Sequence, residues 1–166
     1  PPVKLNKEQI TLIVAVPLTL LAVFQRDLKG DGPGFALVTL LFAWFSDTGG
    51  YFAGRFLGKH KLYEAVSPKK TVEGAIGGLF GSVLGALLAH FWFLPSLPLV
   101  DGIVLAVVSG AVGQAGDLGE SLVKRSTGVK DSGQIVPGHG GVLDRIDALL
   151  LTSTCVYVYA VWFRGI

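Results

Sequence analysis

The chain has 166 residues, of which 51% are hydrophobic and only 16% are charged, whereas soluble domains carry about 25% charged residues. A formal net charge of +2 is too small to indicate nucleic-acid binding, and a single cysteine excludes an internal disulfide and a cysteine-ligated metal cluster. The 23 glycines follow no collagen period and accompany long apolar runs, which is typical of membrane helices that pack closely through small residues.

Five apolar runs follow one another along the chain. A membrane-spanning helix needs about 20 largely apolar residues, and flanking polar residues extend the shorter first, fourth and fifth runs into the interface. The runs are Ile10–Phe24, Phe35–Leu57, Gly74–Pro95, Gly102–Leu118 and Ala148–Phe163. We therefore expect an all-α fold, a polytopic integral membrane helical bundle with about five transmembrane helices.

The second run contains a charged residue where charge is costly. Asp47 lies about twelve residues into the run, about 18 Å along a helix. Ionisable groups inside membrane segments are rare and usually functional, so we expect Asp47 to bind substrate. The alternative is a structural ion pair with Arg55 or with a lysine, which would only hold helices together.

A basic loop separates the second and third runs. Ser67 and Pro68 mark a turn, and Lys69 and Lys70 follow before the third run begins. Ser67 or Thr71 would cap the third helix, while Ser67 and the two lysines are candidates for binding substrate phosphates. Simple anchoring of the lysines to lipid headgroups is the alternative.

The third run carries a stripe of small residues. Gly77, Gly81 and Gly85 recur every four residues and therefore share one helical face. Such a stripe lets another helix approach closely, so we assign these glycines to packing and not to chemistry. The partner helix could belong to the same chain or to a second copy, which leaves a homodimer as an alternative.

Carboxylates gather near the end of the fourth run and the start of the fifth. Asp117 shares a helical face with Glu120 and Ser121, and Asp144 and Asp147 lie three residues apart where the last helix begins. The helix dipole favours one acidic residue in a first turn. It explains Asp144 and Asp147 together less well.

The loop between these runs combines cations with glycines. Lys124, Arg125 and Lys130 lack enough nearby acids to neutralise them, and glycines around His139 leave backbone N–H groups free to face an anion. Arginine and lysine bind phosphate, and carboxylates without cysteine partners favour Mg²⁺. The pattern predicts a site for nucleotide phosphate and metal; an amphipathic loop resting on headgroups is the alternative.

The cations also predict an orientation. With five helices, nine cations fall on one side of the membrane, against Arg26, Lys29 and Arg164 on the other. The positive-inside rule places the basic side in the cytoplasm, although loops that bind phosphate would produce the same bias. The nine are Lys4, Lys7, Lys59, Lys61, Lys69, Lys70, Lys124, Arg125 and Lys130.

The segment SLVKRSTGVKDSGQIVPGHGGVLDRID closely resembles the signature of the phosphatidate cytidylyltransferases, also called CDP-diacylglycerol synthases. The blocks SDTGGYFAGRFLGKHKL and SPKKTVEG also look like that family, and the resemblance extends over residues 35–163. The positions that match the signature are Ser121, Lys124, Arg125, Lys130, Asp131, His139, Gly140, Gly141, Asp144, Arg145 and Asp147.

The resemblance implies an integral enzyme of the bacterial inner membrane, with its active site facing the cytoplasm, that joins CTP and phosphatidic acid. It implies Mg²⁺ on Asp144 and Asp117, with a monovalent K⁺ as a second ion. Lys124, Arg125 and Lys130 complete the expected catalytic set. The expected substrate-binding residues are Asp47, Ser67, Lys69, Lys70, Ser121, Asp131, His139, Gly140, Gly141, Arg145 and Asp147.

Family chains carry additional N-terminal membrane helices, so residues 1–166 are expected to form the C-terminal catalytic membrane part of a cytidylyltransferase. Two other functions fit the residues. One is a CTP-dependent transferase that acts on another lipid phosphate. The other is an ion or proton transporter that uses the buried carboxylates, although a transporter has little need of the basic, glycine-containing loop.

Overall fold

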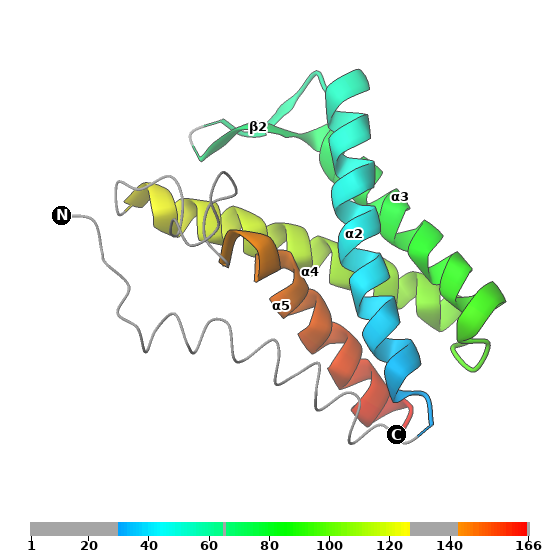
Figure 1. Ribbon diagram of the computed structural model, residues 1–166. Coiled ribbons are helices and arrows are strands. Elements are labelled where there is room, and N and C mark those ends of the chain that lie inside the picture. The colour runs from blue at the N-terminus through cyan, green and yellow to red at the C-terminus, as the bar shows by residue number, and fades with distance from the viewer. Residues whose placement is uncertain (1–29, 65, 127–142, 166) are drawn as a thin grey trace.

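The computed structural model describes residues 30–64, 66–126 and 143–165. Four long helical segments and one β-hairpin make up this part of the chain (Figure 1). In chain order the elements are α2 (Gly32–Phe56), β1 (Lys61–Tyr63), β2 (Ser67–Thr71), α3 (Val72–Leu88), the π-helical turn η1 (Ala89–Phe93), α4 (Leu99–Ser126), α5 (Leu143–Val158) and the π-helical turn η2 (Tyr159–Phe163).

The helices confirm the predicted polytopic membrane bundle. Three are long and apolar enough to cross a membrane, namely Gly32–Phe56, Val72–Phe93 and Leu99–Leu122, and Ala148–Phe163 is a shorter apolar helix. Their outer faces carry large exposed apolar side chains, among them Trp92 and Trp162 at 82% and 80% exposure. Such a surface suits lipid and would be an aggregation hazard in water. The first predicted run, Ile10–Phe24, lies outside the described residues.

Helices α2 and α3 pack through glycine, as the stripe predicted. A Cβ atom added at Gly81 would collide with the Phe45 carbonyl oxygen, and one added at Gly77 would collide with the Ala53 side chain. At Gly85 an added Cβ would meet Leu41 at an ordinary 3.5 Å. Because lipid is as apolar as the helices themselves, this close packing is a main source of helix association in a membrane. The partner helix therefore lies in the same chain.

The apolar core occupies one end of the bundle. It joins the first half of α2, the end of α3, the start of α4 and the second half of α5, with Phe35, Phe42 and Val156 almost completely buried. Polar contacts tie the turns at this end together. Ser96 Oγ donates to Asp31 Oδ2 at 2.6 Å, and an Arg164 guanidinium N–H donates to the Ser96 carbonyl oxygen at 2.9 Å.

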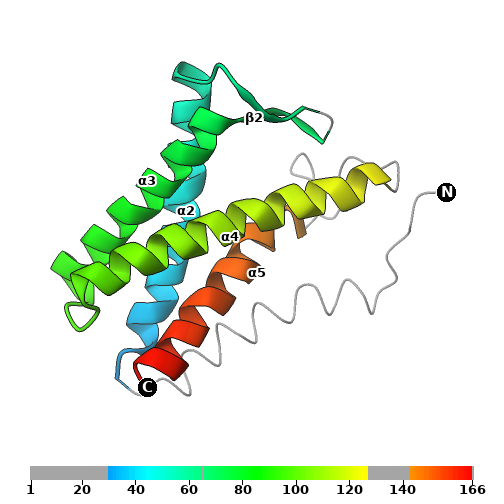
Figure 2. The same cartoon turned by 180° about the vertical axis from the view of Figure 1, so that it is seen from behind.

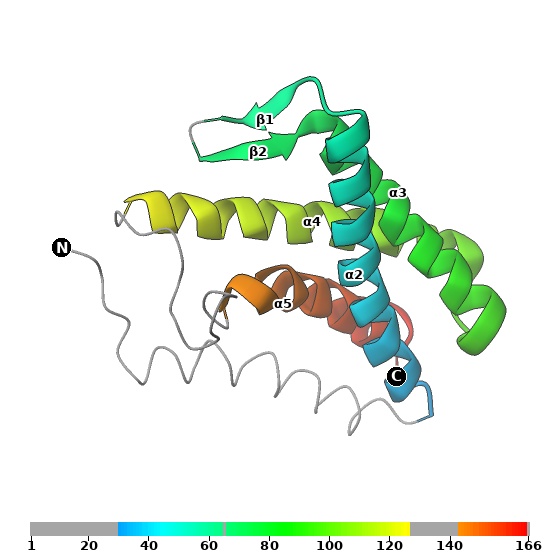
Figure 3. The same ribbon diagram turned by 45° about the horizontal axis from the view of Figure 1, so that its top comes forward.

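The other end of the bundle is basic and carries the hairpin. Views from front and back place the end of α2, the hairpin, the end of α4 and the start of α5 on this side (Figures 1 and 2). The helices thus alternate in direction, as the predicted topology requires. The hairpin itself was not predicted, since residues 58–73 were expected to form a loop. Strands β1 and β2 pair antiparallel, with Lys61 opposite Thr71. The hairpin projects from the ends of α2 and α3 and lies over α4 (Figure 3).

Candidate functional site

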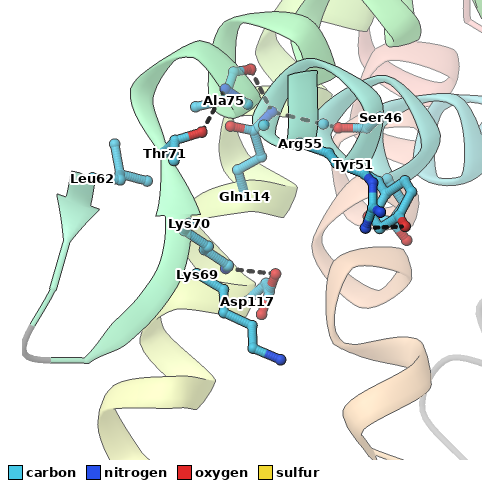
Figure 4. A pocket seen from close by; sticks show the side chains of 14 residues that line it. Ser46, Tyr51, Arg55, Leu62, Lys69, Lys70, Thr71, Ala75, Gln114 and Asp117 are labelled. Carbon is cyan, nitrogen blue, oxygen red and sulfur yellow. Dashed lines mark hydrogen bonds and ion pairs between the residues drawn. The ribbon is translucent and has the colours of Figure 1, made fainter. Parts of the chain in front are cut away.

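A cavity of about 360 Å³ lies between the hairpin and three helices (Figure 4). The second half of α2, strand β2, the first turn of α3 and the later part of α4 all contribute to its wall. Polar groups from segments far apart in the sequence therefore meet at the basic end of the bundle. The lining residues are Ser46, Asp47, Gly50, Tyr51, Gly54, Arg55, Leu62, Lys69, Lys70, Thr71, Gly74, Ala75, Gln114 and Asp117.

Charged residues of both signs face this cavity. Lys70 Nζ on β2 lies 2.5 Å from Asp117 Oδ2 on α4, and Figure 4 shows the two side chains pointing toward one another. Lys69, Arg55 and Asp47 line the same space. The structure thus brings together four residues that the sequence predicted for the site: Asp47, Lys69, Lys70 and Asp117.

Gln114 ties three helices together at the floor of the cavity. From α4, its Nε2 donates to the Ala75 carbonyl oxygen of α3 at 3.0 Å and lies 3.5 Å from Ser46 Oγ of α2. Gly78 leaves room for this side chain, because an added Cβ there would lie 2.6 Å from Gln114 Nε2. Since Gln114 precedes Asp117 by about one helical turn, these bonds also fix the position of the carboxylate.

Two polar side chains, those of Thr71 and Glu73, hold the hairpin over the cavity. Thr71, the N-cap of α3, accepts a hydrogen bond from Gly74 N at 3.1 Å, as its sequence position predicted. Glu73 in the first turn of α3 accepts from the backbone N–H groups of Lys59 and His60 at 3.1 and 3.2 Å. The His60 imidazole Nδ1 lies 2.6 Å from the same carboxylate. These bonds fix both ends of the hairpin to α3.

A second, much smaller cavity of about 20 Å³ adjoins the carboxylates. Asp47 of α2 and Asp117 of α4 both border it, together with Ala148 and Thr152 of α5. Asp144 precedes Ala148 by four residues on α5, about 6 Å along the helix axis. Its side chain lies outside the described residues, but its helix reaches the space that Asp117 borders.

The two described cations of the signature, Lys124 and Arg125, both contact other groups of the protein. Lys124 Nζ lies 3.3 Å from Glu120 Oε1 on the same helix, with both side chains largely buried. Arg125 Nε donates to the Val66 carbonyl oxygen of the hairpin at 3.4 Å. The prediction that nearby acids are too few to neutralise these cations is therefore wrong for Lys124. Among the described residues, neither cation is part of the cavity wall.

The remaining predicted residues are placed as follows. Ser67 opens strand β2, so it does not cap α3, and the cap is Thr71, the other residue expected there. Ser121 is half-buried on α4. The segment with Lys130, Asp131, His139, Gly140 and Gly141 lies outside the described residues, as do the side chains of Arg145 and Asp147 in the first turn of α5.

The chemistry of the lining residues fits Mg²⁺. Asp47, Asp117, Ser46 and Gln114 offer oxygen atoms, which hard divalent cations prefer. The Lys70 ammonium already places a positive charge against Asp117. Within the described part of the chain no group of three or more His, Cys, Asp or Glu side chains comes together. Mg²⁺ does not need such a cage, since it keeps several waters and takes further ligands from substrate phosphates.

Sequence reasoning missed three polar groups of the cavity wall. Gln114, Ser46 and Tyr51 lie inside apolar runs and received no role. The signal for Gln114 was present, because an uncharged but strongly polar side chain in a membrane segment needs a hydrogen-bond partner. Tyr51, whose hydroxyl oxygen lies 3.5 Å from Arg55 Nη1, gave no signal of this kind.

Comparison with known proteins identifies the family of this chain and several similar proteins. A family model described as the cytidylyltransferase family matches residues 7–163. The chain is 47% identical over 140 residues to a phosphatidate cytidylyltransferase of Brucella suis biovar 1 (strain 1330), an alignment that covers 82% of this chain and 51% of that protein. It is 44% identical over 122 residues to the phosphatidate cytidylyltransferase of Staphylococcus haemolyticus (strain JCSC1435), covering 74% of this chain and 47% of that protein. The chain thus spans about half the length of these relatives.

Proposed function

This chain belongs to the cytidylyltransferase family, and from that premise we propose that it transfers the cytidylyl group of CTP to phosphatidic acid. The products are CDP-diacylglycerol and pyrophosphate, and the setting is phospholipid biosynthesis. The reaction is supported by two relatives that are named phosphatidate cytidylyltransferase. The observation that carries the proposal is the cavity at the basic end of the bundle, where carboxylates and lysines from α2, β2 and α4 face one space.

The cavity can receive two anions that repel each other. Lys69 and Lys70 line it from β2 and Arg55 lines it from α2, so their positive charge would screen the triphosphate and the lipid phosphate. An arginine fork can bind two phosphate oxygens at once, and lysine supplies a mobile point charge. These cations lie at the end of membrane-spanning helices, where a lipid headgroup and a water-soluble nucleotide can meet.

The reaction needs positioning and charge neutralisation more than proton transfer. A phosphate oxygen of the lipid attacks the α-phosphorus of CTP, and the bond from that phosphorus to the bridging oxygen breaks as pyrophosphate leaves. We propose that Asp117, with Asp144 from α5, holds Mg²⁺, and that K⁺ is a second ion at the site. If it is bound there, Mg²⁺ would supply the positive charge that stabilises the negative charge developing on the reacting phosphates. No residue is assigned as a general base, because a phosphate monoester with a second pKa near 6 is already ionised.

The signature loop would complete the site. We propose that Lys124, Arg125 and Lys130 clamp phosphates once substrate is bound, with Ser121, Asp131, Arg145 and Asp147 beside them, and that backbone N–H groups at His139, Gly140 and Gly141 bind phosphate oxygens. The described contacts of Lys124 and Arg125 would then rearrange. We further propose that the basic end faces the cytoplasm of a bacterial inner membrane, because CTP is found there and the cation distribution agrees.

The direct test is an assay of the intact protein in detergent or nanodiscs with [α-³²P]CTP and phosphatidic acid. Label should move into a lipid product only when Mg²⁺ is present, with one pyrophosphate released for each lipid formed. Asp144→Asn should abolish the transfer while the protein remains folded. Parallel reactions with other lipid phosphates distinguish the substrate class. If wild-type protein forms no labelled lipid from any of them, the transferase proposal is wrong.

A further inference from the structure

The carboxylate proposed to hold the metal is already occupied by a cation from the protein. Lys70 Nζ lies 2.5 Å from Asp117 Oδ2, across the cavity from strand β2 to helix α4. Both residues line the cavity. Among the described residues, Lys70 is the one that forms a salt bridge with Asp117. Any divalent ion that binds Asp117 must therefore contend with this ammonium group.

An ammonium group and Mg²⁺ do not share one carboxylate comfortably. Mg²⁺ approaches its oxygen ligands to about 2.0–2.1 Å and demands near-ideal octahedral geometry. The Lys70 ammonium occupies an acceptor position on Oδ2, and its positive charge repels an incoming cation at either oxygen of the same carboxylate. Binding of the metal should therefore displace Lys70 from Asp117.

The Lys70 side chain is built to move, while its backbone is not. Its side chain is 27% exposed and that of Asp117 is 39% exposed, and ion pairs with such access to water are weak. Lysine carries its charge on a flexible four-carbon stem. The strand beneath it is fixed by the Thr71 cap and by Lys61 Nζ, which donates to the Pro68 carbonyl oxygen at 2.5 Å. Only the side chain has to change place.

We propose that Lys70 is an exchangeable counter-ion, which neutralises Asp117 in the empty enzyme and is released to substrate phosphate when the metal binds. The inference rests on the proposed function, since it assigns Asp117 to the metal. Lys70 remains in the cavity after release, because its strand is anchored there. Its charge is then available to a triphosphate or lipid phosphate oxygen, and one residue serves two anions in turn.

The exchange makes metal binding depend on nucleotide. Metal alone gains Asp117 but leaves the Lys70 ammonium without its partner and close to the new positive charge. Metal that arrives with a triphosphate supplies a new anion for Lys70, so the same displacement is then favourable. Lys70 should therefore weaken the binding of free metal and strengthen that of the metal–nucleotide complex. This is a coupling between two ligands through one side chain.

Mn²⁺ binding to the intact protein, followed by electron paramagnetic resonance without nucleotide, tests the exchange. Lys70→Met removes the charge but keeps the length of the side chain, and it should bind Mn²⁺ more tightly than wild type, by about fivefold or more. Lys69→Met is the matched control, because it removes one charge from the same wall of the same cavity and keeps the ion pair. It should change Mn²⁺ affinity much less. Addition of CTP should raise Mn²⁺ affinity more in wild type than in Lys70→Met.

Two outcomes of the Mn²⁺ measurement would contradict the exchange. If Lys70→Met binds Mn²⁺ no more tightly than Lys69→Met, Lys70 is not a counter-ion that competes with metal. Lys70→Arg, which keeps the cation, guards against a folding defect and should retain weak binding of free Mn²⁺ like that of wild type; tight binding by Lys70→Arg would overturn the exchange. The readout needs no turnover. A protein that forms CDP-lipid but lacks the Mn²⁺ effect refutes the exchange alone, whereas one that forms no CDP-lipid refutes the proposed function.

Discussion

Asp47 of α2 and Asp117 of α4 border the same two cavities, although they lie on different helices and far apart in the sequence. The close glycine packing of α2 against α3 and the Gln114 bonds from α4 to both helices produce this relationship. The polar end of the bundle is therefore held by the close approach of two backbones and by the half-buried Gln114 amide, while the apolar core stabilises the opposite end. Four predictions test the helix packing, the hairpin anchor, the cap of α3 and the metal site.

Close packing of α2 and α3 should tolerate no side chain at Gly81. Gly81→Ala places a methyl group against the Phe45 carbonyl oxygen, which is backbone and cannot turn aside. We expect a loss of about 1–3 kcal/mol in unfolding free energy, as for other overpacked sites, measured by unfolding in detergent. Gly85→Ala is the control, because its added methyl group meets Leu41 at an ordinary 3.5 Å. Equal stability of the two variants would contradict the packing.

Glu73 should anchor the turn that leads into the hairpin. Glu73→Gln removes the negative charge that receives the N–H groups of Lys59 and His60, and charge-assisted hydrogen bonds are the stronger kind. We expect trypsin to cleave faster after Lys59 in this variant than in wild type. Glu64→Gln, which changes an exposed residue of the same hairpin, should leave the cleavage rate unchanged. Unaltered cleavage of Glu73→Gln would show that the anchor is dispensable.

Thr71 rather than Ser67 should cap α3. Thr71→Ala removes the oxygen that accepts from Gly74 N, and losing an N-cap costs about 1 kcal/mol. Ser67→Ala removes a hydroxyl from the start of β2 and should cost much less. Thermal unfolding of both variants separates the two positions. A greater loss in Ser67→Ala than in Thr71→Ala would reverse the assignment.

The helices were predictable because their signal is local. Apolar runs marked all four described helical segments, and the spacing of Gly77 and Gly81 marked a packing face. The identity of the partner was not predictable, since a small-residue stripe does not specify which helix approaches it. The hairpin was missed because β1 is three exposed residues long and lacks the alternation that marks a strand.

The site was predictable in its residue types and less so in its contacts. Charges within or beside membrane segments singled out Asp47, Lys70 and Asp117, and all three line the cavity. The ion pair between Lys70 and Asp117 depends on how the hairpin folds over α4, which no local pattern encodes. The Lys124 contact, by contrast, was readable from the sequence, because Glu120 lies four residues earlier on the same helix, a spacing at which opposite charges pair. Lys124 was nevertheless treated as available to phosphate.

The most direct test of the central proposal is the Mg²⁺-dependent transfer of label from [α-³²P]CTP to phosphatidic acid by Asp117→Asn. The substitution keeps the size of the side chain but removes the charge that would hold the metal, so transfer should fall to background. Asp101→Asn is the matched control, because Asp101 lies at the other end of α4 and accepts a hydrogen bond from the Tyr159 hydroxyl at 2.7 Å. It should retain transfer. An Asp117→Asn protein that transfers label as fast as Asp101→Asn, with the same dependence on Mg²⁺, would contradict the proposed metal site.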